Sequence, residues 1–173
     1  MKKATPSITF QGNPLTLVGQ PVTVGQQAPD FTALANDLSP VKLSDSAGRV
    51  RILSSVPSLD TPVCDTQTRT FNQKAVNLGD DVVVLTLSVD LPFAQQRWCG
   101  AAGVDRVKTL SDHRDLSFGT AYGLVIQELR LLARAVIVVD KQGIVRYIEV
   151  VKELTHEPNY QAALEAVESL LKT

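Results

Sequence analysis

Cys64 stands where a strand pattern gives way to a helix pattern, and a cysteine in that position can act as a nucleophile. The apolar, largely β-branched run before it stops at Pro57, which removes a backbone donor that a sheet would need. Thr61 suits the N-cap position and Pro62 the first helical position, so we expect a helix that begins at Pro62. Cys64 then lies at N3, where unpaired backbone N–H groups and the helix dipole favour a thiolate.

Three kinds of chemistry could use Cys64, and a buried, inert cysteine is the alternative to all of them. A cysteine hydrolase would need a base, for which His113 is the only plausible residue, but it lies in a polar loop where an exposed bystander is the commoner finding. A zinc site could combine the two cysteines with His113 and His156, although the spacings match no compact metal motif. A redox role needs only a reactive thiol.

Cys99 favours the redox role because it offers a second thiol. It follows a different strand pattern, on a short expected helix between Trp98 and Gly100. A sulfenic acid formed on one cysteine condenses with another thiol and so escapes further oxidation. Composition alone would favour the alternative, in which Cys99 is a small core residue on a helix.

Composition and motifs exclude several other functions. The chain has 173 residues, of which 44% are hydrophobic and 20% charged, and we expect one domain over 1–173. Its formal net charge of −1 indicates no nucleic-acid or membrane partner. There is no glycine-rich nucleotide motif and no serine-hydrolase elbow. Residues 4–13 lack the apolar core of a signal peptide, so we expect a soluble cytoplasmic protein whose cysteines form no permanent structural bridge.

Strand and helix patterns alternate along most of the chain and predict a three-layer α/β sandwich. A hairpin over about 7–19, with its turn at Gln11–Pro14, is expected to be a surface ribbon. The other expected elements are extended pieces at 29–32 and 41–44, strands at 50–56, 82–89 and 107–110, helices at 62–78, 92–102 and 116–122, a hairpin of 135–139 with 144–151, and a closing helix at 160–171.

The same residues resemble a known family, the bacterial thiol peroxidases, which are atypical two-cysteine peroxiredoxins. Pro57, Thr61 and Cys64 match the family's pattern of proline, three residues, threonine, two residues and cysteine. The segment Ser88–Gly100, which contains Cys99, is similar to the segment that carries the family's second cysteine. Further matches are at Phe10–Pro14, Thr109–Gly123 and Leu132–Val136, so the resemblance covers nearly the whole chain.

This resemblance implies a thioredoxin-like fold and an antioxidant enzyme that reduces hydrogen peroxide and organic hydroperoxides to water and alcohols. It implies that Cys64 is the peroxidatic cysteine and Cys99 the resolving one, joined in an intramolecular disulfide that thioredoxin reduces. Thr61 and Arg134 would orient and polarise peroxide and thiolate, and Pro57 would shield the pocket. The family is usually homodimeric, and no metal, haem or flavin is implied.

Arg134 could not be chosen from the other arginines without the resemblance. It precedes the buried-type strand 135–139, so its charge should lie at the edge of the core and have a partner there, for which a thiolate would serve. Two other functional classes stay open, a thiol–disulfide transferase and a non-catalytic thioredoxin-like binding module. A transferase normally has two thiols in Cys-x-x-Cys, whereas residues 63–66 supply only one.

Overall fold

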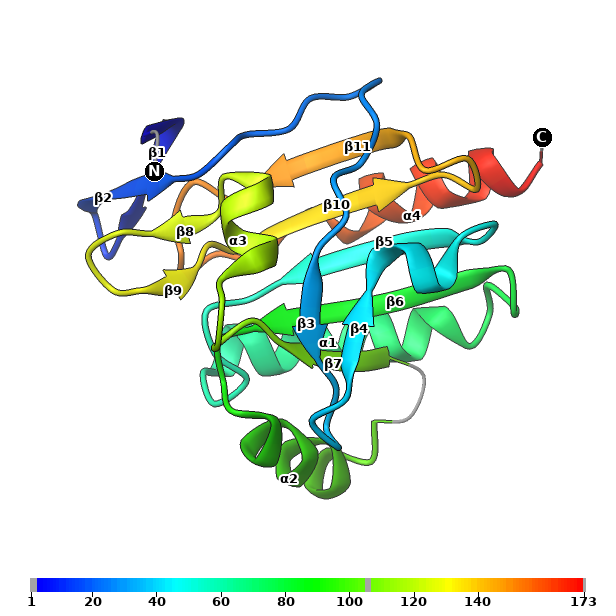
Figure 1. Cartoon of the computed structure of the whole chain (residues 1–173), viewed down its shortest axis with the longest axis horizontal. Coiled ribbons are helices and arrows are strands. Elements are labelled where there is room, and N and C mark those ends of the chain that lie inside the picture. Colours follow the sequence, from blue (N-terminus) through cyan, green and yellow to red (C-terminus); the bar gives the residue numbers. More distant parts are fainter. Residues whose placement is uncertain (1–2, 105–106, 173) are drawn as a thin grey trace.

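A seven-stranded mixed sheet forms the centre of the computed structural model, which describes residues 3–104 and 107–172 (Figure 1). Its strand order is β11-β10-β5-β6-β7-β3-β4. The strands are β3 (Thr32–Leu34), β4 (Pro40–Lys42), β5 (Val50–Ser55), β6 (Val82–Ser88), β7 (Val107–Ser111), β10 (Ala135–Val139) and β11 (Val145–Val150). The helices are α1 (Pro62–Ala75), α2 (Pro92–Ala102), α3 (Ser117–Tyr122) and α4 (Tyr160–Leu171).

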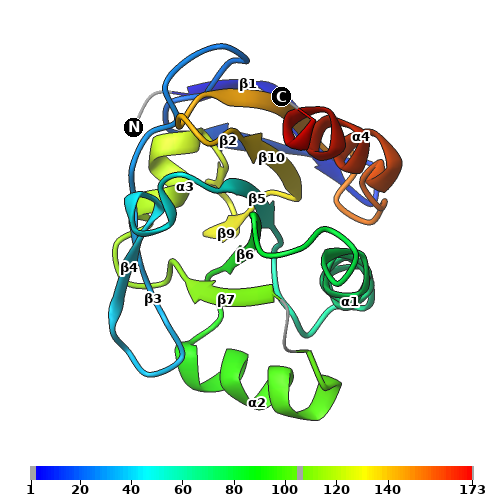
Figure 2. The same ribbon diagram turned by 90° about the vertical axis from the view of Figure 1, so that its right-hand side faces the viewer.

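Both faces of this sheet are covered, which explains the continuous apolar runs of its central strands. Along β5, Ile52 faces the layer of α1 and α4, where it shares a cluster with Phe71 and Val167. Leu53 faces the opposite layer, in the cluster that contains Phe118 of α3. Figure 2 shows α1 and α4 on one side of the sheet and α3 on the other. The expected three-layer α/β sandwich is therefore confirmed.

The amino-terminal hairpin was expected to be a surface ribbon, and that prediction is wrong. Its strands β1 (Lys3–Phe10) and β2 (Asn13–Val18) join β8 (Val125–Ile126) and β9 (Leu131–Leu132) in a second sheet of order β1-β2-β8-β9. Ile8 and Leu17 are only 1% and 2% exposed and belong to the main core. Strands of two residues leave no periodicity in a sequence, so the partner of the hairpin could not be predicted.

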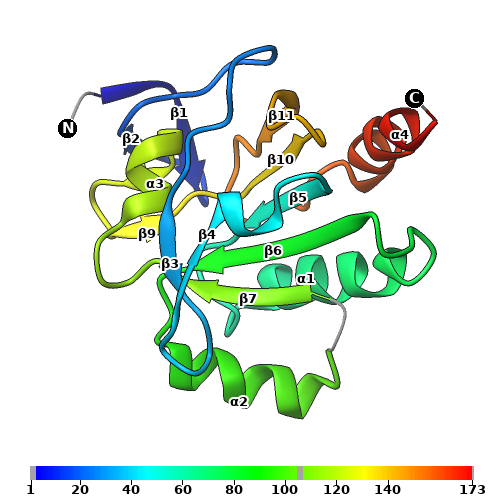
Figure 3. The same cartoon turned by 45° about the vertical axis from the view of Figure 1, so that its right-hand side comes forward.

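Strand pairing brings three distant segments to one end of the sheet. β5, β6 and β7 are parallel, and α1 and α2 are the crossovers between them, so both helices begin beyond the carboxyl ends of the strands they follow (Figure 3). β10 runs antiparallel to β5, with Ala135 opposite Ser55. Arg134, just before β10, therefore lies at the same end of the sheet as the start of α1.

Some predicted boundaries were displaced. α1 ends at Ala75, not near Leu78, because the chain turns there, with the Leu78 N–H donating to the Ala75 carbonyl. Gly79 follows with a φ of +79°, a conformation that suits glycine. The extended piece expected at 29–32 lies later, in β3, and the one expected at 41–44 is β4 followed by a 3₁₀ turn at Leu43–Ser46.

Candidate active site

Cys64 lies at N3 of α1, as its spacing from Thr61 and Pro62 predicted. Its side chain is fully buried and packs with Val56 and Leu59. Thr61 is the N-cap residue, with an extended backbone of φ −92° and ψ 148°, but its side chain makes no capping bond. Its Oγ1 donates instead to the Ser58 carbonyl at 3.0 Å. The first turn of α1, which carries the buried thiol, is thus fastened to the loop before it.

Arg134 is only 2% exposed, and its partners are neutral groups. Nε and Nη2 donate to the Leu154 carbonyl at 3.0 and 2.8 Å, and Nη1 donates to Oε1 of Gln67 at 3.0 Å. The expectation that this charge would lie at the edge of the core with a partner is therefore correct. The partner suggested from sequence was a thiolate, whereas the hydrogen bonds described for Arg134 go to an amide oxygen and a backbone carbonyl.

Gln67 connects Arg134 to the cysteine helix, and the sequence analysis missed it. It lies three residues after Cys64 on α1, a spacing that puts two side chains on one face of a helix, and both are fully buried. Its Nε2 donates to Ser54 Oγ at 2.8 Å. Gln67 is thus fixed by β5 on one side and presents its oxygen to Arg134 on the other. The only sequence signal for Gln67 is its spacing, three residues after Cys64, on the face of the helix that also carries the cysteine.

A carboxylate two residues beyond the end of β6 fixes the loop before α1. Asp90 accepts hydrogen bonds from Ser58 Oγ at 2.7 Å and from the Leu59 N–H at 2.8 Å. Ser88 Oγ also donates to it, at 2.7 Å. Pro57, which begins this loop, is buried. The loop is therefore anchored to the sheet, and this role of Asp90 was not predicted.

Cys99 lies on α2 in different surroundings from Cys64. It is partly exposed, its Sγ lies 3.4 Å from Thr109 Oγ1, and that hydroxyl donates to Asn36 Oδ1 at 3.0 Å. It also lines an open cavity of about 580 Å³ that includes Asn36, Lys108 and Thr109. Both cysteines are free thiols. The structure therefore presents the two sulfur atoms to separate environments in the reduced protein.

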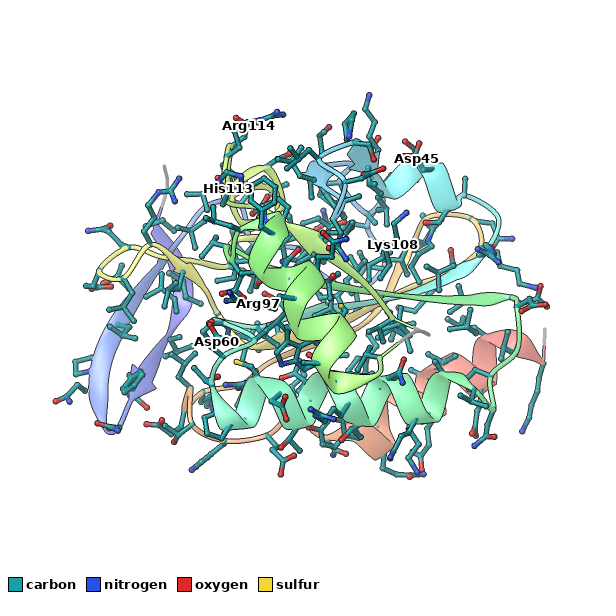
Figure 4. All side chains as sticks on the ribbon, turned by 90° about the horizontal axis from the view of Figure 1, so that it is seen from below. Asp45, Asp60, Arg97, Lys108, His113 and Arg114 are labelled. Atoms are coloured by element: carbon teal, nitrogen blue, oxygen red, sulfur yellow. The ribbon has the colours of Figure 1, made fainter. Side chains whose placement is uncertain are left out.

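His113 does not meet the requirements of a base for Cys64. Its backbone N–H donates to Ser111 Oγ, and its carbonyl accepts from Arg130 Nη2 at 3.1 Å. Figure 4 shows His113 beside Arg114 and apart from the labelled Asp60. No interaction described for residues 3–104 and 107–172 joins His113 to Cys64, so the geometry gives the hydrolase hypothesis no support.

Comparison with known proteins places this chain in a family. The model of the Redoxin family matches residues 23–164. The thiol peroxidase of Halalkalibacterium halodurans is 63% identical over 165 residues, covering 95% of this chain and 99% of that protein. The thiol peroxidase of Bacillus subtilis is 60% identical, covering 95% of this chain and 98% of that protein. The crystal structure of a peroxiredoxin-like protein from Aquifex aeolicus superposes with a TM-score of 0.90 at 38% identity, covering 98% of this chain and 99% of that one.

These matches extend over nearly the whole chain, and the thioredoxin-like fold they share is the one described above. The chain belongs to the redoxin family, and within it to the thiol peroxidases. The family resemblance inferred from Pro57, Thr61 and Cys64 is thereby confirmed. None of the helices in the described part of the chain is long and apolar enough to cross a membrane.

Proposed function

We propose that Cys64 is the thiol that attacks peroxide in this enzyme. Thiol-dependent reduction of peroxides is the activity of the thiol peroxidases, to which the chain belongs. The Cys64 thiolate attacks the terminal oxygen of the hydroperoxide, the O–O bond breaks, and the products are a Cys64 sulfenic acid and an alcohol or water. The observation that carries the proposal is a fully buried thiol at N3 of α1 on the same helix face as Gln67, which holds the buried Arg134.

Arg134 supplies hydrogen-bond donors for the peroxide. A guanidinium has five N–H groups, and the three bonds to Leu154 and Gln67 leave one N–H on each of Nη1 and Nη2 without a partner among the described residues. These two donors can bind the peroxide oxygens and stabilise the negative charge that develops on the leaving oxygen.

Thr61 complements Arg134 as an acceptor. Its hydroxyl proton is engaged by the Ser58 carbonyl, so the lone pairs of Oγ1 are free to accept the hydroperoxide O–H. Pro57 shields the pocket from water, in the loop that Asp90 anchors. Peroxide is thus oriented between one acceptor and two donors while bulk water is kept away from the thiol.

Cys99 resolves the sulfenic acid in the second step. Its thiol attacks the Cys64 sulfur, a disulfide forms between Cys64 and Cys99, and the sulfenic hydroxyl leaves as water. A thiol reductant returns both cysteines to the reduced state, and we assign this role to thioredoxin. No step requires a metal, haem or flavin, because electrons pass from sulfur to oxygen in the first step and between sulfur atoms in the later ones.

The proposal extends to substrates and cellular setting. Pro62, Val63 and Thr66 at the start of α1 line a groove of about 390 Å³. This groove can receive the organic part of a hydroperoxide as well as hydrogen peroxide itself. We further propose a homodimer, as the resemblance to the family implies, and a cytoplasmic location. These assignments are separable, since a monomer could perform the same chemistry.

Stopped-flow oxidation of the reduced protein tests the function. We expect rapid oxidation by both hydrogen peroxide and cumene hydroperoxide, followed by turnover when thioredoxin, thioredoxin reductase and NADPH are supplied. A thiol–disulfide transferase would react with a model disulfide and not with peroxide, and a binding module would react with neither. Oxidation no faster than that of free cysteine would overturn the proposal.

A further inference from the structure

Trp98 packs towards the buried end of α1 that carries Cys64, although it is the immediate neighbour of Cys99. Its side chain packs against the cluster of Val56, Leu59 and Cys64. Successive residues of a helix point about 100° apart, so a helix that turns Trp98 towards α1 turns Cys99 elsewhere. Cys99 accordingly contacts Thr109 on β7. The indole thus occupies the side of α2 that the Cys99 thiol would have to present to Cys64.

Three side chains and one carbonyl fasten α2 to α1 around this point. Trp98 Nε1 donates to Asp65 Oδ1 at 3.0 Å, and Arg69 Nε donates to Asp65 Oδ2 at 2.9 Å. The Arg69 guanidinium carbon lies 5.7 Å from the centroid of the indole ring, within cation–π range. Arg69 Nη1 also donates to the carbonyl of Ala102, the last residue of α2, at 3.3 Å. We refer to Asp65, Arg69, Trp98 and the Ala102 carbonyl as the α1–α2 clasp.

The clasp is suited to opening, because its charged members are partly in water. The side chains of Arg69 and Asp65 are 48% and 34% exposed, and an ion pair in such surroundings contributes little stability. The Trp98 indole, by contrast, is turned into the apolar cluster around Cys64. Opening therefore breaks weak polar contacts at the surface and withdraws one aromatic ring from the cluster of Val56, Leu59 and Cys64.

We propose that the α1–α2 clasp holds Cys99 away from Cys64 and that its opening sets the rate of the second step, disulfide formation. This inference rests on the proposed function, because it concerns the fate of the Cys64 sulfenic acid. While the clasp is closed, a second hydroperoxide can convert the sulfenic acid to a sulfinic acid and release another alcohol. Once it opens, the Cys99 thiol displaces the hydroxyl as water. The clasp thereby determines the balance between resolution and irreversible over-oxidation.

Asp65→Ala tests the proposal, because it removes the acceptor shared by Trp98 and Arg69. We expect disulfide formation to become about three- to tenfold faster and the sulfinic fraction at excess hydroperoxide to fall correspondingly. Acid quenching, alkylation and mass spectrometry count thiol, disulfide and sulfinic acid at each time. Trp98 is the only tryptophan, so its fluorescence follows the opening directly in wild type and Asp65→Ala.

Asp115→Ala, which breaks the exposed pair with Arg114 elsewhere on the surface, is the matched control. It should leave the rates of disulfide formation and of sulfinic acid formation unchanged.

Trp98→Phe supplies the second arm, since phenylalanine keeps an aromatic ring against the cluster around Cys64 but has no indole N–H. It should accelerate disulfide formation as Asp65→Ala does. In the double variant, the acceleration should be smaller than the product of the two single accelerations, because both changes remove the same contact.

Unchanged disulfide formation in Asp65→Ala, or fully multiplicative effects in the double variant, would overturn the proposal. Either result is distinct from failure of the proposed function, in which wild-type Cys64 itself would not be oxidised by hydroperoxide. Alkylation of the reduced proteins gives a readout without peroxide: Cys64 should react faster with iodoacetamide in Asp65→Ala than in Asp115→Ala, and equal rates would also count against the clasp.

Discussion

Arg134 and Gln67 form a buried hydrogen bond of 3.0 Å that ties the start of β10 to the helix carrying Cys64. The donor is a charged group and the acceptor a neutral amide, so the charge of the guanidinium is not cancelled by a carboxylate at this contact. A cation desolvated in this way interacts more strongly with an anion placed beside it. The arrangement is therefore suited to a thiolate and to the oxyanion that leaves when the O–O bond breaks.

Arg134→Ala should slow peroxide attack by about 100-fold, because it removes the donors proposed to stabilise the leaving oxygen. Stopped-flow oxidation of the reduced variant measures this rate. The variant should also lose about 2–4 kcal/mol of unfolding free energy, since it leaves the Leu154 carbonyl and Gln67 Oε1 without this donor. Arg49→Ala, at an exposed arginine, should change neither quantity. An attack rate equal to that of wild type would remove Arg134 from the chemistry.

Gln67 is predicted to act as a positioning residue through Arg134. Gln67→Ala should slow attack by about tenfold, because Nη1 of Arg134 loses the contact that orients the guanidinium. Gln67→Glu keeps an oxygen acceptor at the same place, but its carboxylate partly cancels the charge of the guanidinium, so it should recover only part of the rate. Stopped-flow oxidation of both variants gives the comparison. If alanine and glutamate variants were equally slow, the role of Gln67 would be packing and not orientation.

Cys99→Ser should separate the two chemical steps. Its first oxidation should proceed at nearly the wild-type rate, because Cys99 lies against Thr109 and not against Cys64. The reaction should then stop at a sulfenic acid that dimedone traps and excess peroxide over-oxidises. Single-turnover oxidation followed by mass spectrometry detects both products. Normal cycling with thioredoxin in this variant would show that Cys99 is not the resolving thiol.

Asp112 predicts a distinctive dependence of stability on pH. Burial raises its pKa from 3.8 to about 6, although the N–H groups of Phe118 and Gly119 donate to it. A carboxyl with a raised folded-state pKa favours folding most below its unfolded pKa, and that contribution is lost as pH rises from about 4 to about 6. The loss amounts to roughly 3 kcal/mol.

Denaturant unfolding at intervals between pH 4 and pH 7 measures this effect. Asp112→Asn cannot titrate, so the unfolding free energy of wild type relative to this variant should fall as pH rises. The variant itself should be less stable at low pH, because its amide nitrogen cannot accept the bond from the Gly119 N–H. A difference between the two proteins that stays constant with pH would mean that Asp112 has an ordinary pKa.

The sequence was sufficient for features that depend on neighbouring residues. Strand, proline, N-cap and helix follow one another around Pro57 and Thr61, so the placement of Cys64 at N3 followed from local preferences and was correct. The partners of Arg134 were beyond sequence reasoning, because Gln67 and Leu154 reach it only through tertiary packing. The clasp between Asp65 and Trp98 joins residues 33 positions apart, a contact that no periodicity encodes. The hairpin itself was predicted, but its pairing with β8 and the burial of Ile8 and Leu17 were missed for the same reason, since that pairing depends on two short strands far along the chain.

Single-turnover oxidation followed by intact-protein and peptide mass spectrometry tests the central claim most directly. Reduced protein treated with one equivalent of hydroperoxide, without reductant, should lose the mass of two hydrogen atoms. It should also yield one linked peptide pair containing Cys64 and Cys99, and Cys64→Ser should consume no peroxide. The account would be contradicted if peroxide disappeared while both thiols could still be alkylated, or if Cys64→Ser consumed peroxide as wild type does.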